Sequence, residues 1–477
     1  MKRSFLANLV FLILLNLLIK PFWFLGIEVS VQNIVGNAEY GIYFSLLGLS
    51  LTLNILLDLG ITNFTNREVA RHQHLASKYL NNIILIKLYL GFFYAATMLV
   101  VSLFMGYTER HLKILFFLVI NQFLASFLLY LRSYINGLHL FIADSLLSIA
   151  DKLLMIIICG TIVWFIPGIG FKIEWFVYAQ TVAYIIPIIV ALGVLHNNLQ
   201  SIKPRNDIRY FLTIAKESRL FAILVLVMFI YNRIDAVLLE RILPNGNIEA
   251  GIYAQSYRLI DFASNYAFLF ATLLLPIFSR MLKEKNDVSG IVQTSLKFLI
   301  VPTLIISIGG WFFKNEILHL LYNRTSGNGI ELGLLFIGFV GVASNYIFGT
   351  LLTANGNIKE LIFIALGVMV LNLFLNFNLI PTMKVTGAAL SFLITQLVSA
   401  SIQLYFAHRK IKIDIEKSFY SKCLILTSIL FLCLYILKLT SLSTYYEIVI
   451  FISLSLLLTF VLKFINLSEL KTLINKK

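Results

Sequence analysis

The sequence predicts an all-α polytopic membrane protein of about fourteen transmembrane helices, built from two related halves. Hydrophobic residues make up 59% of the 477 residues and charged residues only 13%, whereas soluble domains carry about 25% charged residues. The apolar residues fall in runs near the ~20 residues needed to cross the hydrocarbon core of a bilayer. An eight-residue stretch in the first half returns in the second half, which indicates a duplication.

The repeated stretch has the pattern Gly-Asn-x-Glu-x-Gly-Ile-Tyr and occupies residues 36–43 and 246–253. Each copy lies in a short turn between two apolar runs, so each marks the corner of a helix pair. The offset from 36 to 246 is 210 residues, which is too long for a solenoid repeat but fits half of a transporter. Lys87 and Lys297 are separated by the same offset. The alternative is that ordinary turn and interface residues recur by chance.

In order along the chain, the apolar runs define six predicted spans in each half and a final pair without a counterpart. The first-half spans are Phe5–Ile27, Gly41–Asn63, Tyr79–Phe104, Leu112–Gly137, Leu146–Ile166 and Trp175–Leu195. The second-half spans are Ser218–Glu240, Gly251–Leu275, Ser295–Phe313, Leu332–Ala354, Leu361–Ile380 and Gly387–Ala407, and the final pair is Lys422–Lys438 and Tyr446–Leu462. The predicted domains are an N-terminal lobe (1–196), a cytoplasmic connector (197–217), a C-terminal lobe (218–408) and the additional pair with a cytoplasmic tail (409–477).

The basic residues predict the orientation in the membrane. The start, Met1-Lys2-Arg3, leads into the first span without a signal-peptide cleavage site. Most Lys and Arg fall in alternate loops, such as those around Arg67, Arg280 and Arg409. The positive-inside rule places these loops and both termini in the cytoplasm. An even number of spans per half gives the two halves the same orientation, as in a parallel repeat.

The same features argue against other classes of protein. The net charge of +15 comes without the basic stripe and stacking aromatics of nucleic-acid-binding proteins. Cys159, Cys423 and Cys433 lie in apolar runs without metal-ligand spacing, so neither disulfides nor a metal site are predicted. There is no Gly-x-x-x-x-Gly-Lys motif for ATP. The sequence therefore predicts no catalytic residue, metal or cofactor.

Polar residues inside the spans are the candidate functional residues, because a charge at the centre of a span costs about 2.5–3.5 kcal/mol. Helical spacing places one stripe on a face of the eighth span: Gln255, Arg258, Asp261 and Asn265. A second stripe lies in the second span: Ser50, Asn54, Asp58 and Thr62. The first span carries Lys20 directly before Pro21, which predicts a kink. We expect a hydrated central cleft lined by Lys20, Lys87, Arg233, Gln255, Arg258, Asn265 and Lys297.

Ion pairing is the competing interpretation of these charges. Arg258 with Asp261, and Arg233 with Asp235 or Asp261, could form clamps between or along helices. Asp58, Asp235 and Asp261 are therefore assigned either to ion coupling or to structural pairing.

Other polar residues in the spans fall into three groups. Lys20 and Lys87 have no acid within a turn of their own helices, which predicts unpaired cations. Asp151-Lys152 is interpreted as a solvated helix end. Asn372 and Asn376 are predicted to hydrogen-bond across helices.

The excess of cations in the spans predicts an anionic cargo, such as the diphosphate of a lipid-linked sugar, because such a group needs compensating charge in a low-dielectric region.

Several segments resemble bacterial polysaccharide-repeat-unit flippases (Wzx type) of the multidrug/oligosaccharidyl-lipid/polysaccharide exporter superfamily. The similar stretches are Asn8–Leu18, Pro21, Gly36–Tyr43, Asp58–Gly60, Arg67–Arg71, Gly251–Tyr253, Tyr257–Asp261 and Leu275-Pro276. The resemblance implies two lobes in a V shape and movement of undecaprenyl-diphosphate-linked oligosaccharides by alternating access. The movement would be from the cytoplasmic to the periplasmic leaflet of the inner membrane, for O-antigen, capsule or exopolysaccharide assembly. It also implies cavity roles for Lys20, Arg233 and Arg258.

Two other functions remain open at this stage. A multidrug or organic-cation exporter of the same superfamily would favour acidic cavity groups, whereas Lys and Arg prevail here. An integral-membrane glycan polymerase or glycosyltransferase would need paired acids on a substantial outside loop. Expected partners are the lipid-linked oligosaccharide and the bilayer, with a glycan polymerase and a chain-length regulator as candidates and no nucleic acid. The sequence leaves open whether a proton or a sodium gradient drives the cycle.

Overall fold

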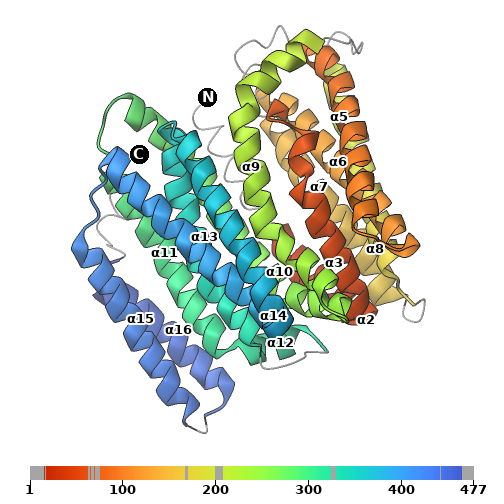
Figure 1. Cartoon of the computed structure of the whole chain (residues 1–477). Helices are drawn as coiled ribbons and strands as arrows, with labels where there is room; N and C mark the ends of the chain where they lie inside the picture. The colour runs from red at the N-terminus through yellow and green to blue at the C-terminus, as the bar shows by residue number, and fades with distance from the viewer. Residues whose placement is uncertain are drawn as a thin grey trace. The chain divides into compact units, whose positions relative to one another are not determined.

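The computed structural model describes residues 16, 18–62, 65, 69, 76–166, 170–198, 208–323, 329–440 and 442–464 (Figure 1). Within these residues the chain is helical and has no β-strand. Eleven helices in this part are long and apolar enough to cross a membrane. Four parts lie outside the described residues: the start of the first predicted span, the basic residues Arg67 and Arg71, residues 199–207 of the predicted connector, and the tail after residue 464.

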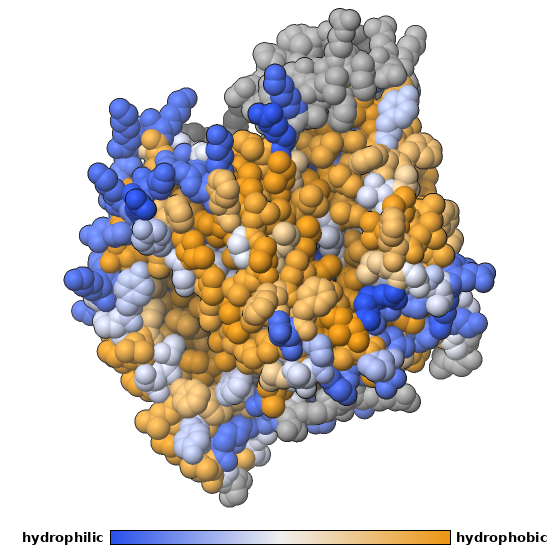
Figure 2. Space-filling model, in the orientation of Figure 1, coloured by the Kyte–Doolittle hydropathy of each residue, from blue (hydrophilic) through white to orange (hydrophobic). Residues whose placement is uncertain are grey.

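Large hydrophobic side chains cover the flanks of the long helices. Phe92 and Phe363, on two different helices, are each 75% exposed, and many other large apolar side chains are exposed as well. In water, contact of so much apolar surface with the solvent would be unfavourable. Figure 2 shows hydrophobic residues over much of the visible face and hydrophilic residues gathered toward the helix ends. This surface suits a chain whose surrounding solvent is a lipid bilayer.

The chain forms two compact units, the first comprising residues 1–255 with 321–324 and the second residues 256–320 with 325–477. The helices of the first unit are α2 (Val29–Val35), α3 (Asn37–Thr52), α5 (Ala76–Phe104), α6 (Glu109–Gly137), α7 (Phe141–Gly160), α8 (Ile173–Asn198) and α9 (Ile208–Ile242), with the start of α10 (Gly246–Lys283). The boundary lies inside α10, whereas the lobes predicted from the duplication divide the chain at residues 196–218. Those lobe boundaries stay a prediction.

Two of the local departures from regular helix in the first unit lie in the predicted first and second spans. A π-helical segment, Phe22–Glu28, follows Pro21, because proline removes one backbone donor and its ring pushes the preceding turn apart. The predicted kink is thus an underwound stretch within a helix that continues through α2. The second departure lies after α3, where the helix ends at Thr52 and a short 3₁₀ turn, Asn54–Leu57, follows.

The two copies of the repeated stretch lie against each other within the first unit. A Cβ atom on Gly41 would collide with the backbone carbonyl oxygen of Asn247, and one on Gly251 would collide with that of Asn37. Gln32 donates a hydrogen bond of 2.8 Å to the carbonyl oxygen of Gly251. The glycines of the repeat are therefore required where the starts of α3 and α10 cross at backbone contact.

The second unit is built from the rest of α10 and six further helices. These are α11 (Ser289–Phe312), α12 (Lys314–Leu321), α13 (Ile330–Ala354), α14 (Ile358–Ile411), α15 (Lys417–Lys438) and α16 (Thr444–Val461). In this unit α13 packs on α11 and α14, and α11 also packs on α15. The predicted final pair corresponds to α15 and α16. Lys438 at the end of α15 holds this pair, since its Nζ lies 2.6 Å from Glu316 and 2.8 Å from Glu447.

Two predicted spans, Leu361–Ile380 and Gly387–Ala407, lie in the single long element α14. The backbone bends between them at Lys384, where φ is 51° and ψ is −129°, three residues after Pro381. Across this bend, Asn372 donates to the Ser391 hydroxyl at 3.4 Å. Asn376 donates to Asn372 at 3.1 Å along the same helical segment. The predicted hydrogen bonding across helices is confirmed for Asn372.

Candidate functional site

The break after α3 creates a polar site inside the first unit. Leu59 and Gly60 have φ of 46° and 87°, a left-handed conformation that leaves the carbonyl groups before it without helical partners. The helix resumes at Ile61, and the Asp58 carboxylate accepts hydrogen bonds from the backbone N–H and the hydroxyl of Thr62. Asp58 thus caps the second helical segment. The predicted stripe along one continuous helix was wrong here, because α3 ends at Thr52 and the helix resumes only at Ile61.

Lys87 on α5 reaches into this break. Its Nζ lies 2.5 Å from the Asp58 carboxylate, donates to the Leu57 carbonyl oxygen at 3.0 Å and lies 3.3 Å from the Ser126 hydroxyl. The ring centroid of Tyr130 lies 5.5 Å from the same nitrogen. The Lys87 side chain is 1% exposed. The prediction of an unpaired Lys87 was therefore wrong, because its acid comes from the preceding span and not from its own helix.

Other side chains satisfy the remaining groups of the break. Tyr94 on α5 donates its hydroxyl to the Ser50 carbonyl oxygen at 2.8 Å. Asn54 donates to the side chain of Gln122 on α6 at 2.7 Å. Irregular backbone at membrane depth persists only where neighbouring groups replace its lost hydrogen bonds. The Asp58–Lys87 pair thus fits the predicted alternative of structural pairing for Asp58.

A second polar cluster surrounds Lys20, beside the π-helical segment of the first helix. Lys20 lies within electrostatic range of Lys152, Asp151 and Arg132. Two of these neighbours have acids of their own: Lys152 Nζ is 3.1 Å from Asp151, and Arg132 Nε is 2.7 Å from Asp144. Within the described residues, Lys20 itself makes no hydrogen bond or ion pair. Glu28 in the π-helical segment also lies within electrostatic range of Lys152. The cluster therefore combines three cations with three acids, and its two described ion pairs belong to Arg132 and Lys152.

The surroundings of this Lys20 cluster are ordered by packing from three elements. Asn16, one turn before Lys20, donates to the Ser148 hydroxyl on α7 at 3.3 Å. The ammonium of Lys152 lies 5.3 Å from the ring centroid of Trp23. Asn136 at the end of α6 donates to Asp144 at 3.0 Å. Lys20 is thus half-buried in a polar region whose other members are held in place by hydrogen bonds and a cation–π contact.

Sequence reasoning missed part of this cluster. Asp151-Lys152 was interpreted as a solvated helix end, but both side chains lie beside Lys20, well inside α7. Arg132 and Asp144 were not singled out. Asp144, Ser148 and Lys152 follow a spacing of four along α7, and this helical periodicity is the signal that could have found them.

The remaining predicted residues of the first unit lie in helix contacts. Asp235 on α9 is 1% exposed and accepts a hydrogen bond of 3.0 Å from the Tyr253 hydroxyl. Gln255 is 2% exposed and donates to Asn37 at 3.0 Å. Arg233 on α9 is half-buried, and its backbone carbonyl lies against Gly48. These placements connect α3, α9 and the start of α10.

In the second unit, Arg258 and Asp261 face each other along α10 with Nη1 and Oδ2 3.7 Å apart. Asn265 donates to the Asp261 backbone carbonyl at 2.8 Å. Lys297 on α11 interacts electrostatically with Glu416, the residue before α15. Hydrogen bonds from Ser418 and then Gln293 hold the pKa of Glu416 below its ordinary value, and Lys297 adds to this. Lys297 therefore differs in surroundings from Lys87, its counterpart in the predicted duplication.

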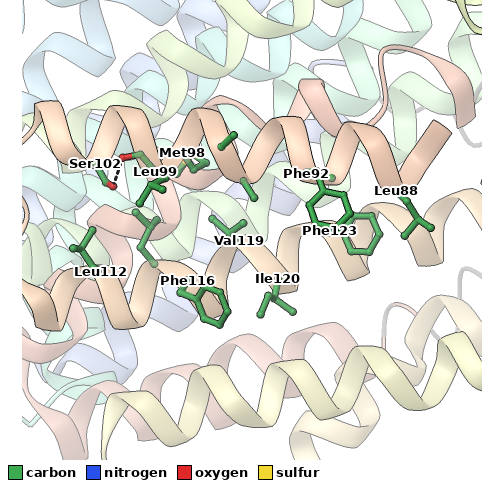
Figure 3. A pocket seen from close by; sticks show the side chains of 14 residues that line it. Leu88, Phe92, Met98, Leu99, Ser102, Leu112, Phe116, Val119, Ile120 and Phe123 are labelled. Atoms are coloured by element: carbon green, nitrogen blue, oxygen red, sulfur yellow. Dashed lines mark hydrogen bonds between the residues drawn. The ribbon is translucent and has the colours of Figure 1, made fainter. Parts of the chain in front are cut away.

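The first unit also holds an apolar groove between α5 and α6, with a cavity volume of about 700 Å³ (Figure 3). None of the predicted cleft residues lines it. The part of the chain that the structure describes contains no group of three or more His, Cys, Asp or Glu able to hold a metal ion.

Comparison with solved structures identifies the fold. The lipid II flippase MurJ in an inward closed conformation superimposes with a TM-score of 0.71 at 15% identity, covering 94% of this chain and 98% of that chain. An inward-facing multidrug resistance MATE family transporter of the MOP superfamily gives 0.66 at 14% identity, with coverage of 82% and 94%. A MOP superfamily transporter from Pyrococcus furiosus gives 0.62 at 15% identity, with coverage of 85% and 95%. The chain thus has the fold of MOP superfamily transporters, and the predicted all-α polytopic membrane fold is confirmed.

Comparison with family sequences goes one step further. Residues 5–282 match the family described as polysaccharide biosynthesis protein, and the chain belongs to this family. A search of curated protein sequences gives no match. The resemblance found from the sequence motifs is confirmed at the level of the family. The predicted class, a transporter and not an enzyme, is the class to which the matched structures belong.

Proposed function

We propose that this protein is a flippase that moves undecaprenyl-diphosphate-linked oligosaccharide repeat units from the cytoplasmic to the periplasmic leaflet. The observation that carries the proposal is the Lys20 cluster, where one half-buried cation lies beside two paired cations in a membrane-spanning unit. A diphosphate crossing a low-dielectric region needs positive charge held in place beforehand. The family match and the MurJ-like fold support a lipid-linked substrate.

In the proposed cycle, Lys20 receives the diphosphate while Arg132 and Lys152 remain oriented by Asp144 and Asp151. Because these two cations keep their acids, the headgroup would replace water around Lys20 without breaking a buried pair, which would cost several kcal/mol. Because the headgroup would contact Lys20 without displacing Asp144 or Asp151, its binding would be weak enough for release on the other side of the membrane. Arg233 and Arg258 are further proposed contacts for the headgroup, and the cycle proceeds by alternating access.

The setting of this function is also part of the proposal. We place the protein in the bacterial inner membrane with both termini in the cytoplasm, as its basic loops indicate. The product would feed O-antigen, capsule or exopolysaccharide assembly, with a glycan polymerase and a chain-length regulator as candidate partners. A proton or sodium gradient is the proposed energy source, and Asp58 and Asp261 are the candidate coupling carboxylates.

A second candidate is a multidrug or organic-cation exporter. It is favoured by the MATE family structure, whose TM-score of 0.66 is close to that of the flippase. The charge of the site distinguishes the two functions, since an organic cation would be repelled by Lys20 and its cationic neighbours. Export of a cationic dye that survives Lys20→Ala would favour the exporter.

The proposed function is tested in cells whose surface glycan depends on this protein. Lys20→Ala or Arg258→Ala should abolish the surface glycan while the amount of protein in the membrane stays normal, and Lys20→Arg should retain part of it. Lys410→Ala is the matched control. Lys410 lies in the last turn of α14, is 45% exposed and pairs with Glu360 in the first turn of the same element. Normal glycan in both alanine variants would remove the assignment of these cations to the substrate.

A further inference from the structure

The groove between α5 and α6 runs along both helices. The side chains that face it include Leu88, Phe92, Leu99, Phe116 and Phe123 (Figure 3). Small residues, Gly91, Ala95 and Ala96, line it on the α5 side, and this lack of side-chain bulk leaves the space open. A Cβ atom on Gly91 would come within 2.6 Å of the Phe123 ring. The two helices therefore touch where Gly91 meets Phe123 and leave room between them farther along.

The lining is suited to hydrocarbon. Ser102 is the single polar residue among the fourteen that line the groove, and its hydroxyl already donates to the Leu99 carbonyl oxygen at 2.7 Å. No polar group in the groove is free to recognise a headgroup or a peptide. Phe92 and Phe116 are 75% and 61% exposed at its edges. Since both helices are membrane spans by length and composition, any occupant comes from within the bilayer.

The size of the groove favours a single chain. Leu88 and Ser102 are fourteen residues apart, or about 21 Å along a helix. A volume of about 700 Å³ over this length gives a mean cross-section on the order of 30 Å². A transmembrane helix with its side chains has a diameter of ~10–12 Å, so its cross-section is larger than that of the groove. A diacyl lipid would fit only one of its two chains into the groove. A polyprenyl lipid has one chain.

The position of the groove connects it to the polar interior of the first unit. At one end of the groove, Leu88 directly follows Lys87, and Phe123 is close in sequence to Gln122 and Ser126. Lys87, Gln122 and Ser126 all contact the helix break or each other there, so this end of the groove lies beside the break. With the predicted orientation, the groove extends from mid-membrane to the outer ends of α5 and α6. We propose that it binds the polyprenyl tail of the transported lipid in the outer half of the bilayer. This inference rests on the proposed function and adds to it a site for the tail.

Photo-crosslinking of the full chain in bilayer nanodiscs tests the proposal. One probe is a polyprenyl diphosphate with a diazirine in its tail, and the other is a phosphatidylglycerol with a diazirine in one acyl chain. Mapping by mass spectrometry should place the polyprenyl crosslinks on α5 and α6, and unlabelled polyprenyl diphosphate should compete them away. Ala95→Phe and Ala96→Phe, which fill the groove, should lower this labelling at least about fivefold.

Val182→Phe on α8 is the matched control, because Val182 is 46% exposed and does not line the groove; its labelling should stay unchanged. Ala96 is exposed, so Ala96→Phe keeps the test valid if Ala95→Phe disturbs folding. Equal, uncompeted labelling of the groove by both probes would overturn the inference and identify ordinary bilayer lipid. Competed polyprenyl labelling elsewhere on the protein would overturn the inference but leave the proposed function standing. No competed polyprenyl labelling anywhere would contradict the proposed function itself.

Discussion

Lys20 and Lys87 are both lysines inside membrane-spanning segments of the first unit, yet their surroundings differ. Lys87 is fully buried, and Asp58, Leu57, Ser126 and the ring of Tyr130 occupy the positions around its ammonium. Lys20 is half-buried, and the nearest acids already serve Arg132 and Lys152. The comparison teaches that a buried charge indicates function only after its partners are counted. Lys87 is paired with Asp58 at a helix break, whereas Lys20 is the proposed contact for an anion.

The largest effect should come from Lys20→Met. We expect loss of transport with the melting temperature unchanged or slightly raised, because the substitution removes a desolvated cation without leaving an acid unpaired. Lys87→Met is the matched substitution at the other site. Reconstituted transport and thermal unfolding of the two variants would separate the sites. A fall in stability for Lys20→Met as large as that for Lys87→Met would break the comparison.

Lys87→Met should lower the free energy of unfolding by about 2–4 kcal/mol. This is somewhat less than the ~3–5 kcal/mol for a fully buried pair, because Asp58 is 23% exposed. The double variant Asp58→Asn/Lys87→Met should recover part of the loss, since it leaves no unpaired charge. Denaturation in mild detergent would measure both. Additive losses in the double variant would show that the pair does not stabilise the break.

Tyr94→Phe should cost about 1–2 kcal/mol of stability, because the Ser50 carbonyl oxygen at the end of α3 would lose its buried donor. Tyr178→Phe on α8 provides the control, as no hydrogen bond of its hydroxyl is found within the described residues. Thermal unfolding of both variants is the measurement. Equal melting temperatures would mean that the break does not need this bond.

The smallest expected effect is that of Asp144→Asn. Arg132 would lose its partner at 2.7 Å, and the field around Lys20 would become more positive. Binding of a diphosphate should tighten about two- to fivefold, or ~0.4–1 kcal/mol. Isothermal titration of the purified protein would detect this change. Weaker binding would show that Asp144 orients Arg132 for direct contact with the ligand.

The sequence was sufficient for the spans, because each is a long apolar run with polar residues at its ends. The hydrogen bond from Asn372 to Ser391 across the bend followed from the tendency of amides inside spans to bond to neighbouring helices. The break at Asp58 was missed because Ser50, Asn54, Asp58 and Thr62 also fit a helical period. Asp58-Leu59-Gly60, a capping residue before a glycine, was the local signal against it.

The partners of the two lysines could not be predicted from spacing. Lys87 finds Asp58 on the preceding span, and Arg132 finds Asp144 across a helix–helix corner. Both contacts depend on which helix faces are packed together, and that information is tertiary. For Lys20 the absence of an acid on its own helix happened to match its surroundings, while for Lys87 the same argument failed.

The central claim is that the Lys20 cluster holds the diphosphate of the transported lipid. Its most direct test is the affinity of the purified, full-length protein for a short-chain polyprenyl diphosphate, compared among the wild type, Lys20→Met and Lys87→Met under conditions where all three are folded. We predict that Kd rises about tenfold or more for Lys20→Met, the loss expected for a charge-assisted hydrogen bond, and stays within about twofold for Lys87→Met. An unchanged Kd for Lys20→Met would contradict the account.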